Sequence, residues 1–377
     1  MKQSDKLTIL AVETSCDDTC AAVVEIKTQK GQKKPFFKIL SNIVSSQTEI
    51  HKKWGGVYPT MAKREHQKNL PLVLKKALKK AKKSLLVCRG KQAGVNLIAL
   101  TAGPGLEPCL WTGINFTKNI ARKINVPIIP VNHIESHILV NFINSKNQDK
   151  NFSENFPAVC LIASGGHTQL ILMKNIGKYR IIGETRDDAA GECFDKTARI
   201  LGLEYPGGPA LAALAAKAEK TTEASNKEKI KAKKEKSPPV KIKSFLPRPM
   251  INQKNYDFSF SGLKTAVLYS KENFGRKELA KEIQQAIIDV LIKKTIKAAK
   301  NFKAKTIILG GGVTANAELK KQFRRRIKKI NSKIKLLAPL KRFCSDNAVM
   351  TAAAGYFNLG KKTKNWNKIK AKANWRI

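Results

Sequence analysis

Two pairs of apolar runs, one in each half of the chain, form the clearest pattern in the sequence. Residues 7–26 contain two strand-like runs, separated by a short polar segment that carries Asp17 and Asp18. Residues 157–173 contain two more, separated by Ser164-Gly165-Gly166-His167. Each pair predicts a β-hairpin. The return of the hairpin about half a chain later indicates an internal duplication.

A second repeated pattern follows each hairpin. The apolar run 96–101 leads into Ala102-Gly103-Pro104-Gly105 and then into a helical stretch. The run 305–309 leads in the same way into Gly310-Gly311-Gly312 and a helical stretch. Each half of the chain therefore combines a hairpin with a strand, a glycine turn and a helix. This order of elements predicts an α/β fold of two duplicated lobes around a central cleft.

The charge of the chain is strongly unbalanced. Among its 377 residues, 72 Lys and Arg outnumber 28 Asp and Glu, which gives a formal net charge of +44. The hydrophobic content of 42% is ordinary for a globular protein, so the excess charge has to lie on the surface. Such a surface favours RNA as a partner, because lysines that neutralise phosphates release counterions. A general lysine bias is the alternative.

Two lysine-rich segments stand apart from the predicted lobes. Residues 217–243 contain a Pro238-Pro239 pair and no aromatic residue, so we expect either a disordered insertion or a basic arm that tethers RNA. Residues 356–377 form a basic tail in which Trp366 and Trp375 could stack on bases. A frayed terminal helix is the alternative for the tail.

Cysteine usage and the distribution of apolar residues bear on the compartment. The seven cysteines include no C-x-x-C pair, and their odd number argues against a disulfide framework and for a reducing compartment. The N-terminal residues lack the pattern of a signal peptide, and no window approaches the roughly 18 consecutive apolar residues of a membrane-spanning helix. We therefore expect a soluble, cytoplasmic protein without membrane contact.

His133 and His137 are spaced to share one face of a helix, where both imidazoles can bind one metal ion. The metalloprotease pattern H-E-x-x-H is absent, because Ile134 follows the first histidine. Asp346, just before an alanine-rich helix, is the best candidate for a third ligand. Two imidazoles and one carboxylate leave open positions for substrate oxygens. The alternative for Asp346 is a helix N-cap.

The glycine turns at 164–166 and 310–312 could present backbone amides to a nucleotide or phosphate, or could simply be tight turns. A third glycine segment, Tyr205-Pro206-Gly207-Gly208-Pro209, follows a stretch that contains Asp195. This stretch could bring Asp195 into the cleft to meet a ribose or an ammonium group. An ordinary surface helix with solvated acids is the alternative.

Seven motifs, in this order along the chain, resemble the TsaD/Gcp family of tRNA N6-adenosine threonylcarbamoyltransferases. They are Glu13-Thr14-Ser15-Cys16-Asp17-Asp18-Thr19, His133-Ile134-Glu135-Ser136-His137, Ser164-Gly165-Gly166-His167-Thr168-Gln169-Leu170, residues 187–196, Tyr205-Pro206-Gly207-Gly208-Pro209, residues 258–265 and residues 310–316. The resemblance extends from about residue 7 to residue 355. Because the motifs occur as an ordered set, the resemblance is specific.

The resemblance implies an actin/hexokinase/Hsp70-like (ASKHA) fold with a central nucleotide cleft. It also implies an acyl transfer, in which a threonylcarbamoyl group passes from threonylcarbamoyl-AMP to N6 of adenosine 37 in tRNAs that read codons beginning with A. We expect an N-terminal lobe at 1–130, a C-terminal lobe with the metal motif at 131–355, and the basic tail at 356–377.

The resemblance further implies which residues bind the metal and the substrate. His133, His137 and Asp346 fall on the family's metal ligands, with Fe²⁺ as the expected ion and Zn²⁺ as the alternative. The residues that fall on substrate-binding positions are Ile162, Ala163, Ser164, Gly165, Gly166, Asp195, Gly208 and Asn316. The implied partners are tRNA, a paralogous TsaB-type subunit and a TsaE-type ATPase.

Two features depart from the family's pattern. Ser136 stands where the family usually has glycine, and the insertion at 217–243 stands where relatives have a shorter link. Two other functions also remain as alternatives. One is a kinase or ATPase of the same fold that uses Asp17 or Asp18 with Mg²⁺, and the other is a non-catalytic RNA-binding scaffold.

Overall fold

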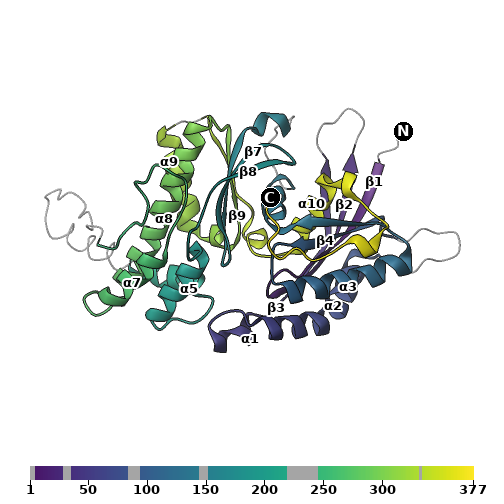
Figure 1. Cartoon of the computed structure of the whole chain (residues 1–377), viewed down its shortest axis with the longest axis horizontal. Coiled ribbons are helices and arrows are strands. Elements are labelled where there is room, and N and C mark those ends of the chain that lie inside the picture. Colours follow the sequence, from purple (N-terminus) through teal and green to yellow (C-terminus); the bar gives the residue numbers. More distant parts are fainter. Residues whose placement is uncertain (1–4, 29–34, 84–93, 144–151, 219–244, 331–332) are drawn as a thin grey trace, which may run out of the picture.

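The fold is known from a computed structural model, which shows two α/β lobes side by side (Figure 1). The structure describes residues 5–28, 35–83, 94–143, 152–218, 245–330 and 333–377. Nearly all of the predicted insertion at 217–243 lies outside the described residues. Among the described helices, none is long and apolar enough to cross a membrane.

The first sheet has five strands in the order β3-β2-β1-β4-β5. The strands are β1 (Asp5–Glu13), β2 (Asp18–Thr28), β3 (Phe36–Ser46), β4 (Leu97–Gly103) and β5 (Ile128–Asn132). Strands β1, β2 and β3 pair in antiparallel fashion, and β1, β4 and β5 pair in parallel. The hairpin expected around residues 14–18 is confirmed.

The second sheet repeats this plan, with the order β8-β7-β6-β9-β10. The strands are β6 (Ala158–Ala163), β7 (Thr168–Asn175), β8 (Lys178–Glu184), β9 (Thr306–Gly310) and β10 (Lys335–Leu337). Strands β6, β7 and β8 are antiparallel, and β6, β9 and β10 are parallel. Because strand order and direction agree in both sheets, the predicted duplication is confirmed.

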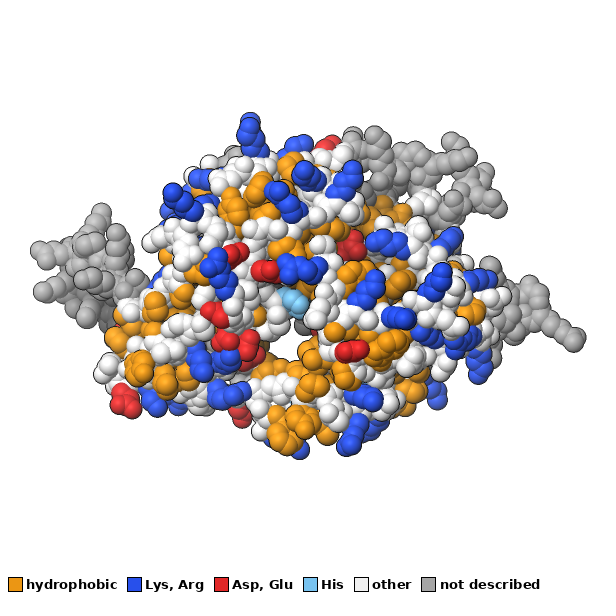
Figure 2. All heavy atoms as spheres, viewed as in Figure 1, with side chains coloured by type: hydrophobic (Ala, Val, Ile, Leu, Met, Phe, Trp, Pro, Cys, Tyr) orange, Lys and Arg blue, Asp and Glu red, His pale blue; other side chains and the backbone are white. Residues whose placement is uncertain are grey.

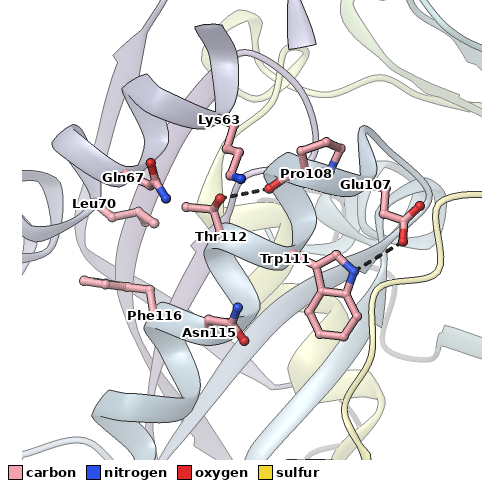
Figure 3. Close-up of a pocket in the computed structure, with 9 residues that line it drawn as sticks. All are labelled: Lys63, Gln67, Leu70, Glu107, Pro108, Trp111, Thr112, Asn115 and Phe116. Atoms are coloured by element: carbon pink, nitrogen blue, oxygen red, sulfur yellow. Dashed lines mark hydrogen bonds between the residues drawn. The ribbon is translucent and has the colours of Figure 1, made fainter. Parts of the chain in front are cut away.

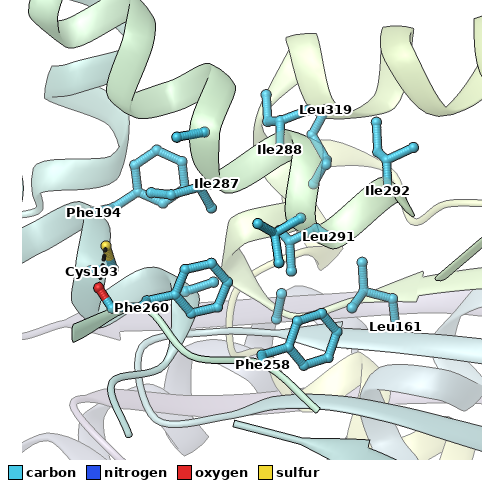
Figure 4. Close-up of a cluster of buried hydrophobic side chains, with 14 of the residues drawn as sticks. Leu161, Cys193, Phe194, Phe258, Phe260, Ile287, Ile288, Leu291, Ile292 and Leu319 are labelled. Carbon is cyan, nitrogen blue, oxygen red and sulfur yellow. Dashed lines mark hydrogen bonds between the residues drawn. The ribbon is translucent and has the colours of Figure 1, made fainter. Parts of the chain in front are cut away.

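Helices cover the outer faces of both sheets. On the first lobe these are α2 (Pro59–Ala81) and α3 (Glu107–Ile124), and on the second they are α5 (Ala190–Ile200), α7 (Ser261–Ser270), α8 (Arg276–Asn301) and α9 (Ala317–Ile330). In the second lobe, Phe194, Phe258 and Phe260 pack against Ile287 and Leu291 of α8 in one buried cluster (Figure 4). This cluster packs α8 against β6 and β9, the strands that lead into the two glycine turns.

Two buried helices lie between the sheets: α4 (His133–Leu139) and α10 (Ala348–Phe357). They share one hydrophobic cluster with side chains from both sheets, such as Ile9 of β1 and Ile171 of β7. Two further helices are α1 (Thr48–His51) and a helix over residues 207–218. The 3-10 helices are η1 (Lys52–Trp54), η2 (Val140–Phe142), η3 (Phe152–Asn155), η4 (Gly312–Ala315), η5 (Lys341–Phe343), η6 (Leu359–Lys361) and η7 (Trp366–Lys368).

The C-terminal end of the chain returns to the first lobe. Sequence position placed α10 in the second lobe, whereas it packs on β1, β2 and β4 of the first sheet. Residues 358–377 contain the 3-10 helices η6 and η7 but no α-helix, so the frayed-helix alternative for the tail is wrong. Trp366 and Trp375 are partly buried against the core of the first lobe, which limits their use as stacking platforms.

Candidate functional site

Helix α4 carries His133 and His137, begins immediately after β5, and is the candidate metal helix. The side chain of Asn132 caps it by accepting hydrogen bonds from the backbone N–H of Ile134 (2.8 Å) and Glu135 (3.1 Å). On this helix the rings of His133 and His137 lie with centroids 4.7 Å apart. The expected shared face of the two histidines is therefore confirmed.

Asp346 approaches both histidines from the loop before α10. Its Oδ1 lies 3.5 Å from Nε2 of His133 and 3.2 Å from Nε2 of His137. The N-cap of α10 is Asn347, whose side chain accepts a hydrogen bond from the N–H of Met350. The helix-cap alternative for Asp346 is therefore wrong, because the neighbouring residue fills that role and leaves the Asp346 carboxylate facing the imidazoles.

The geometry of these three side chains fits one metal ion. One ligand atom from each lies within 4.8 Å of the others. Two ligands at about 2.1 Å from a tetrahedral ion are about 3.4 Å apart, close to the distances that Asp346 keeps to His133 and His137. The His137 side chain is 1% exposed, and neither ring nitrogen makes a hydrogen bond within the described part of the chain. A bound cation would satisfy Nε2.

Glu13, at the end of β1, orients His133, and sequence reasoning assigned it no role. Its fully buried carboxylate lies 3.2 Å from Nδ1 of His133 and accepts hydrogen bonds from the N–H of Ser15 and the hydroxyl of Thr101. Burial opposes its ionisation, but His133 holds the pKa of Glu13 below its usual value. With Nδ1–H directed at Glu13, Nε2 of His133 is free to bind a metal. The sequence signal that could have identified Glu13 is its position as a charged residue at the end of an apolar strand.

We expect Glu13→Gln to weaken metal binding by roughly 10- to 100-fold, the range seen when the partner of a metal-bound histidine is changed. The amide can donate to Nδ1 of His133, which moves the ring proton to Nε2 and blocks the ligand position. Competition with a chelator would measure the metal dissociation constant of both proteins. An unchanged constant would show that Glu13 does not set the tautomer.

Burial also disfavours His133 as a cation, yet the charges of Asp346 and Glu13 raise its pKa to about 9. Burial likewise opposes ionisation of Asp346, but His133 and His137 lower its pKa to about 2. The site therefore combines two carboxylates with two imidazoles in a buried position. This donor set attracts a divalent cation, and binding would release the proton from His133.

The hairpin tip between β1 and β2 carries Asp17 and Asp18 beside the metal helix. Burial, followed by the charges of Asp346 and Asp17, raises the pKa of Asp18 to about 7. Burial and Asp346 also raise the pKa of Asp17. The structure thus brings the expected acids of the hairpin close to the candidate metal ligand Asp346.

His66 of α2 holds this tip in place, and nothing in the sequence pointed to it. Its ring is fully buried, with Nε2 at 2.9 Å from the carbonyl oxygen of Cys16 and Nδ1 at 2.8 Å from the hydroxyl of Thr19. The carbonyl only accepts, so Nε2 carries the hydrogen and Nδ1 accepts from Thr19. A neutral His66 therefore fixes both ends of the acidic tip.

The two glycine turns pack against each other and against the metal helix. Gly311 has φ +88°, and a Cβ there would lie 2.4 Å from the carbonyl oxygen of Ala163. A Cβ on Gly310 would lie 2.9 Å from the carbonyl oxygen of His137. In contrast, a Cβ on Gly165 or Gly166 would meet no atom within 4 Å. The backbone of the Ser164 turn is thus open on one side, and Figure 2 shows a hollow between the lobes with a histidine at its edge.

Two other predicted substrate residues, Asp195 and Gly208, lie next to each other. Helix α5, which carries Asp195, starts so close to this turn that a Cβ on Gly191 would lie 2.6 Å from the carbonyl oxygen of Ser164. Oδ1 of Asp195 accepts a hydrogen bond from the N–H of Gly207, and burial raises its pKa. A Cβ on Gly208 would meet only Phe194, at 3.9 Å.

Asn316 differs from these residues because both ends of its amide are engaged within the protein. Its Nδ2 donates to Gln284, and its Oδ1 accepts from the N–H of Leu319 in the first turn of α9. Ile162 and Ala163 are buried in β6, where Ile162 pairs with both β7 and β9. The structure therefore supports a structural role for Asn316 beside any role in binding.

A pocket of about 610 Å³ lies away from these residues, between α2 and α3 (Figure 3). It is lined by Lys63, Gln67, Leu70, Glu107, Pro108, Trp111, Thr112, Asn115 and Phe116. None of the predicted site residues contributes to it. We therefore place the chemistry at the histidine site and not in this pocket.

Comparison with known sequences connects this arrangement to one family. Residues 38–353 match the family model described as tRNA N6-adenosine threonylcarbamoyltransferase. Curated relatives with that name include proteins of Thermosipho africanus, 42% identical over 92% of this chain and 93% of the relative, and Clostridium perfringens, 39% identical over 99% of each. A relative from Syntrophomonas wolfei is 39% identical over 94% of this chain and 93% of its own length.

Comparison with solved structures supports the fold. The structure of full-length HypF in its phosphate- and nucleotide-bound form aligns with 97% of this chain and 48% of that protein, with a TM-score of 0.56 and 12% identity. HypF from T. kodakarensis aligns with 94% of this chain and 48% of its own length, with a TM-score of 0.56 and 13% identity. At such identities the likeness concerns the fold alone, and the ASKHA fold expected from the sequence is confirmed.

Proposed function

Because this chain belongs to the tRNA N6-adenosine threonylcarbamoyltransferase family, we propose that its cleft takes threonylcarbamoyl-AMP as donor and adenosine 37 of tRNAs that read codons beginning with A as acceptor. The transferase activity itself follows from the family. The observation that carries the proposal is the meeting of His133, His137 and Asp346 beside the open Ser164 turn. The donor is both a nucleotide and an acyl phosphate. It therefore needs a turn that binds the nucleotide and a cation that binds the phosphate, next to each other.

In the proposed reaction, N6 of adenosine attacks the carbamoyl carbon of the donor. A C–N bond forms, the bond between that carbon and the phosphate oxygen breaks, AMP leaves, and N6 loses one proton. The amine is a weak nucleophile because its lone pair is delocalised into the purine ring. Catalysis therefore has to come mainly from positioning of the two substrates and from stabilisation of the charge that develops on oxygen.

His133, His137 and Asp346 would hold the divalent ion, with Glu13 fixing the orientation of His133. When bound, such an ion supplies a positive charge for phosphate and carbonyl oxygens. Two imidazoles and one carboxylate with open positions are typical of Fe²⁺ sites and also occur around Zn²⁺. We propose Fe²⁺ as the ion, with Zn²⁺ as the alternative. Metal analysis of protein purified without oxygen would distinguish the two.

The glycine turns would bind the nucleotide part of the donor. The Ser164 turn offers backbone groups on its open side, and Asp195 presents a buried carboxyl beside Gly207 and Gly208. A carboxyl in this position can accept a hydrogen bond from a ribose hydroxyl. Ile162 and Ala163 would support the Ser164 turn from the end of β6, and Asn316 would shape the site from the start of α9.

We expect Gly208→Val to raise the dissociation constant of a non-hydrolysable threonylcarbamoyl-adenylate analogue by at least about tenfold, a loss of about 1.4 kcal/mol. The protein leaves room at this position, since a Cβ would meet only Phe194, so the branched side chain would instead occupy ligand space. Isothermal titration would measure the constant. Gly360→Val, at another position with free space, is the control and should bind as the wild type does.

The same analogue tests the proposal against the kinase or ATPase alternative. We expect it to bind more tightly than ATP, and we expect chelation of the metal to weaken its binding. Equal or tighter binding of Mg²⁺-ATP, with no effect of removing the histidine-bound metal, would favour the alternative that uses Asp17 or Asp18. A protein that binds neither ligand would fit the scaffold alternative.

On the family's pattern, we propose that the chain acts with a paralogous TsaB-type subunit and a TsaE-type ATPase, in the cytoplasm where tRNA is modified. Modification of a tRNA transcript by the chain alone, and by the chain with each partner added, would show which partners are required. Full activity of the chain alone would remove both from the proposal.

A further inference from the structure

The C-terminal tail packs along the first lobe as far as the residue that precedes the metal helix. Thr363 forms a β-bridge with Ile128, at the start of β5. Farther along, the N–H of Lys372 donates to the carbonyl of Ala102. The carbonyl of Ala373 accepts from the N–H of Gly105 (3.1 Å). These backbone hydrogen bonds hold the tail along the first sheet, from the start of β5 to the end of β4.

The tail is basic and contains no acidic residue. After Asp346, the chain has seven basic residues and no Asp or Glu, namely Lys361, Lys362, Lys364, Lys368, Lys370, Lys372 and Arg376. Of these, Arg376 pairs with Glu184 of β8 at 2.9 Å. The others form no salt bridge with any residue that the structure describes. Such unneutralised cations on a fixed backbone create a positive field above the surface.

Helix α3 adds further cations to the same surface. Arg122 donates to the side chain of Asn367 at 2.7 Å, which places it against the tail. Burial, followed by the charges of Arg122 and Lys370, lowers the pKa of Lys118, so these three cations lie near one another. Figure 2 shows Lys and Arg side chains over the exposed face of the first lobe. We call Arg122, Lys123, Lys364, Lys368, Lys370 and Lys372 the basic strap.

The basic strap ends beside the metal site. The carbonyl of Trp375 accepts a hydrogen bond from Asn132, the residue immediately before His133. Gly105, which is bonded to Ala373, packs on Ser15, and the hydroxyl of Ser15 lies 3.1 Å from Nδ1 of His133. Lys370 is five residues before Trp375, at most about 18 Å of extended chain. The strap is therefore within reach of a substrate whose reacting base lies at the metal.

We propose that the basic strap binds phosphates of the anticodon arm of tRNA while the target adenosine occupies the metal site. This inference rests on the proposed function and adds the surface that holds the RNA. A substrate helix with a phosphate every few ångströms matches a row of lysines along an extended chain better than a compact ligand does.

The test compares two charge-matched triple variants of the full chain, with every partner protein that the wild type needs. Lys123→Gln, Lys368→Gln and Lys370→Gln together remove three charges from the strap. Lys300→Gln, Lys328→Gln and Lys329→Gln remove three exposed charges from the second lobe, at the ends of α8 and α9. The dissociation constant for an unmodified tRNA transcript is measured between 50 and 200 mM salt.

We expect the strap variant to bind tRNA about tenfold or more weakly near 100 mM salt, with a log–log salt slope smaller by about 2, because each phosphate contact contributes about 0.7–0.9. The second-lobe variant should change the constant less than about twofold. Replacing the same three strap lysines by arginine should keep wild-type affinity, which separates loss of charge from loss of fold.

Equal weakening in both glutamine variants would overturn the proposal, since overall charge would then explain binding. Wild-type affinity and slope in the strap variant would also overturn it. Failure of the proposed function would look different, because the wild type itself would then form no modified adenosine in the complete mixture.

Discussion

The variant His137→Ala is expected to lose its bound metal and to transfer threonylcarbamoyl at least about 100-fold more slowly than the wild type. Changes to residues that only support a metal ligand cost 10- to 100-fold, and His137 is itself a ligand in this account. The fold should persist, because removal of the ring also removes two buried nitrogens that lack hydrogen bonds. We expect the free energy of unfolding of the metal-free protein to change by no more than about 2 kcal/mol.

Metal analysis, the single-turnover rate and thermal unfolding of the same preparation would measure these effects. His51→Ala is a suitable control, since His51 is another fully buried histidine but bonds to Gln47 and Tyr58 outside the metal site. It should retain the metal even if it unfolds at a lower temperature. If His137→Ala loses the metal and still modifies tRNA at the wild-type rate, the metal has no role in transfer.

Replacing two neighbouring residues should separate metal binding from helix capping. Asp346→Ala is expected to abolish metal binding and to slow transfer at least about 100-fold, with little loss of stability, because its carboxylate faces His133 and His137. Asn347→Ala is expected to lower the free energy of unfolding by about 1 kcal/mol, because it removes the cap of α10. Metal content and denaturant unfolding of both variants would measure the difference.

A reversed outcome would contradict the assignment. If Asp346→Ala keeps its metal but unfolds more easily, while Asn347→Ala keeps its stability, then Asp346 is a structural residue of the loop. The metal would in that case need another third ligand from the cleft.

The repeated architecture could be predicted because it depends on local patterns. Apolar alternation, glycine turns and their order along the chain define both hairpins and both strand–turn–helix units, and the two sheets confirm them. The spacing of His133 and His137 likewise predicts a shared helical face, since three to four residues complete one turn. Asp346 was a candidate for the third ligand from its place just before an alanine-rich helix, and the resemblance to the family implied the same residue.

Features that depend on contacts between distant segments could not be predicted in the same way. Glu13 meets His133 across 120 residues, and His66 meets Cys16 across 50, so no local pattern links them. The choice of Asn347 over Asp346 as the cap of α10 depends on the direction of two side chains that propensity treats alike. The course of the tail depends on apolar anchors such as Ile369, which is 3% exposed among lysines.

The most direct test of the central claim is nucleoside mass spectrometry of a tRNA transcript that reads codons beginning with A, after incubation with threonylcarbamoyl-AMP and the protein with its partners. We expect N6-threonylcarbamoyladenosine from the wild type. We expect none from His137→Ala, and none when position 37 of the transcript is guanosine. Equal yields from the wild type and His137→Ala would contradict a role of the metal site in transfer, and modification that does not depend on adenosine 37 would contradict the proposed acceptor.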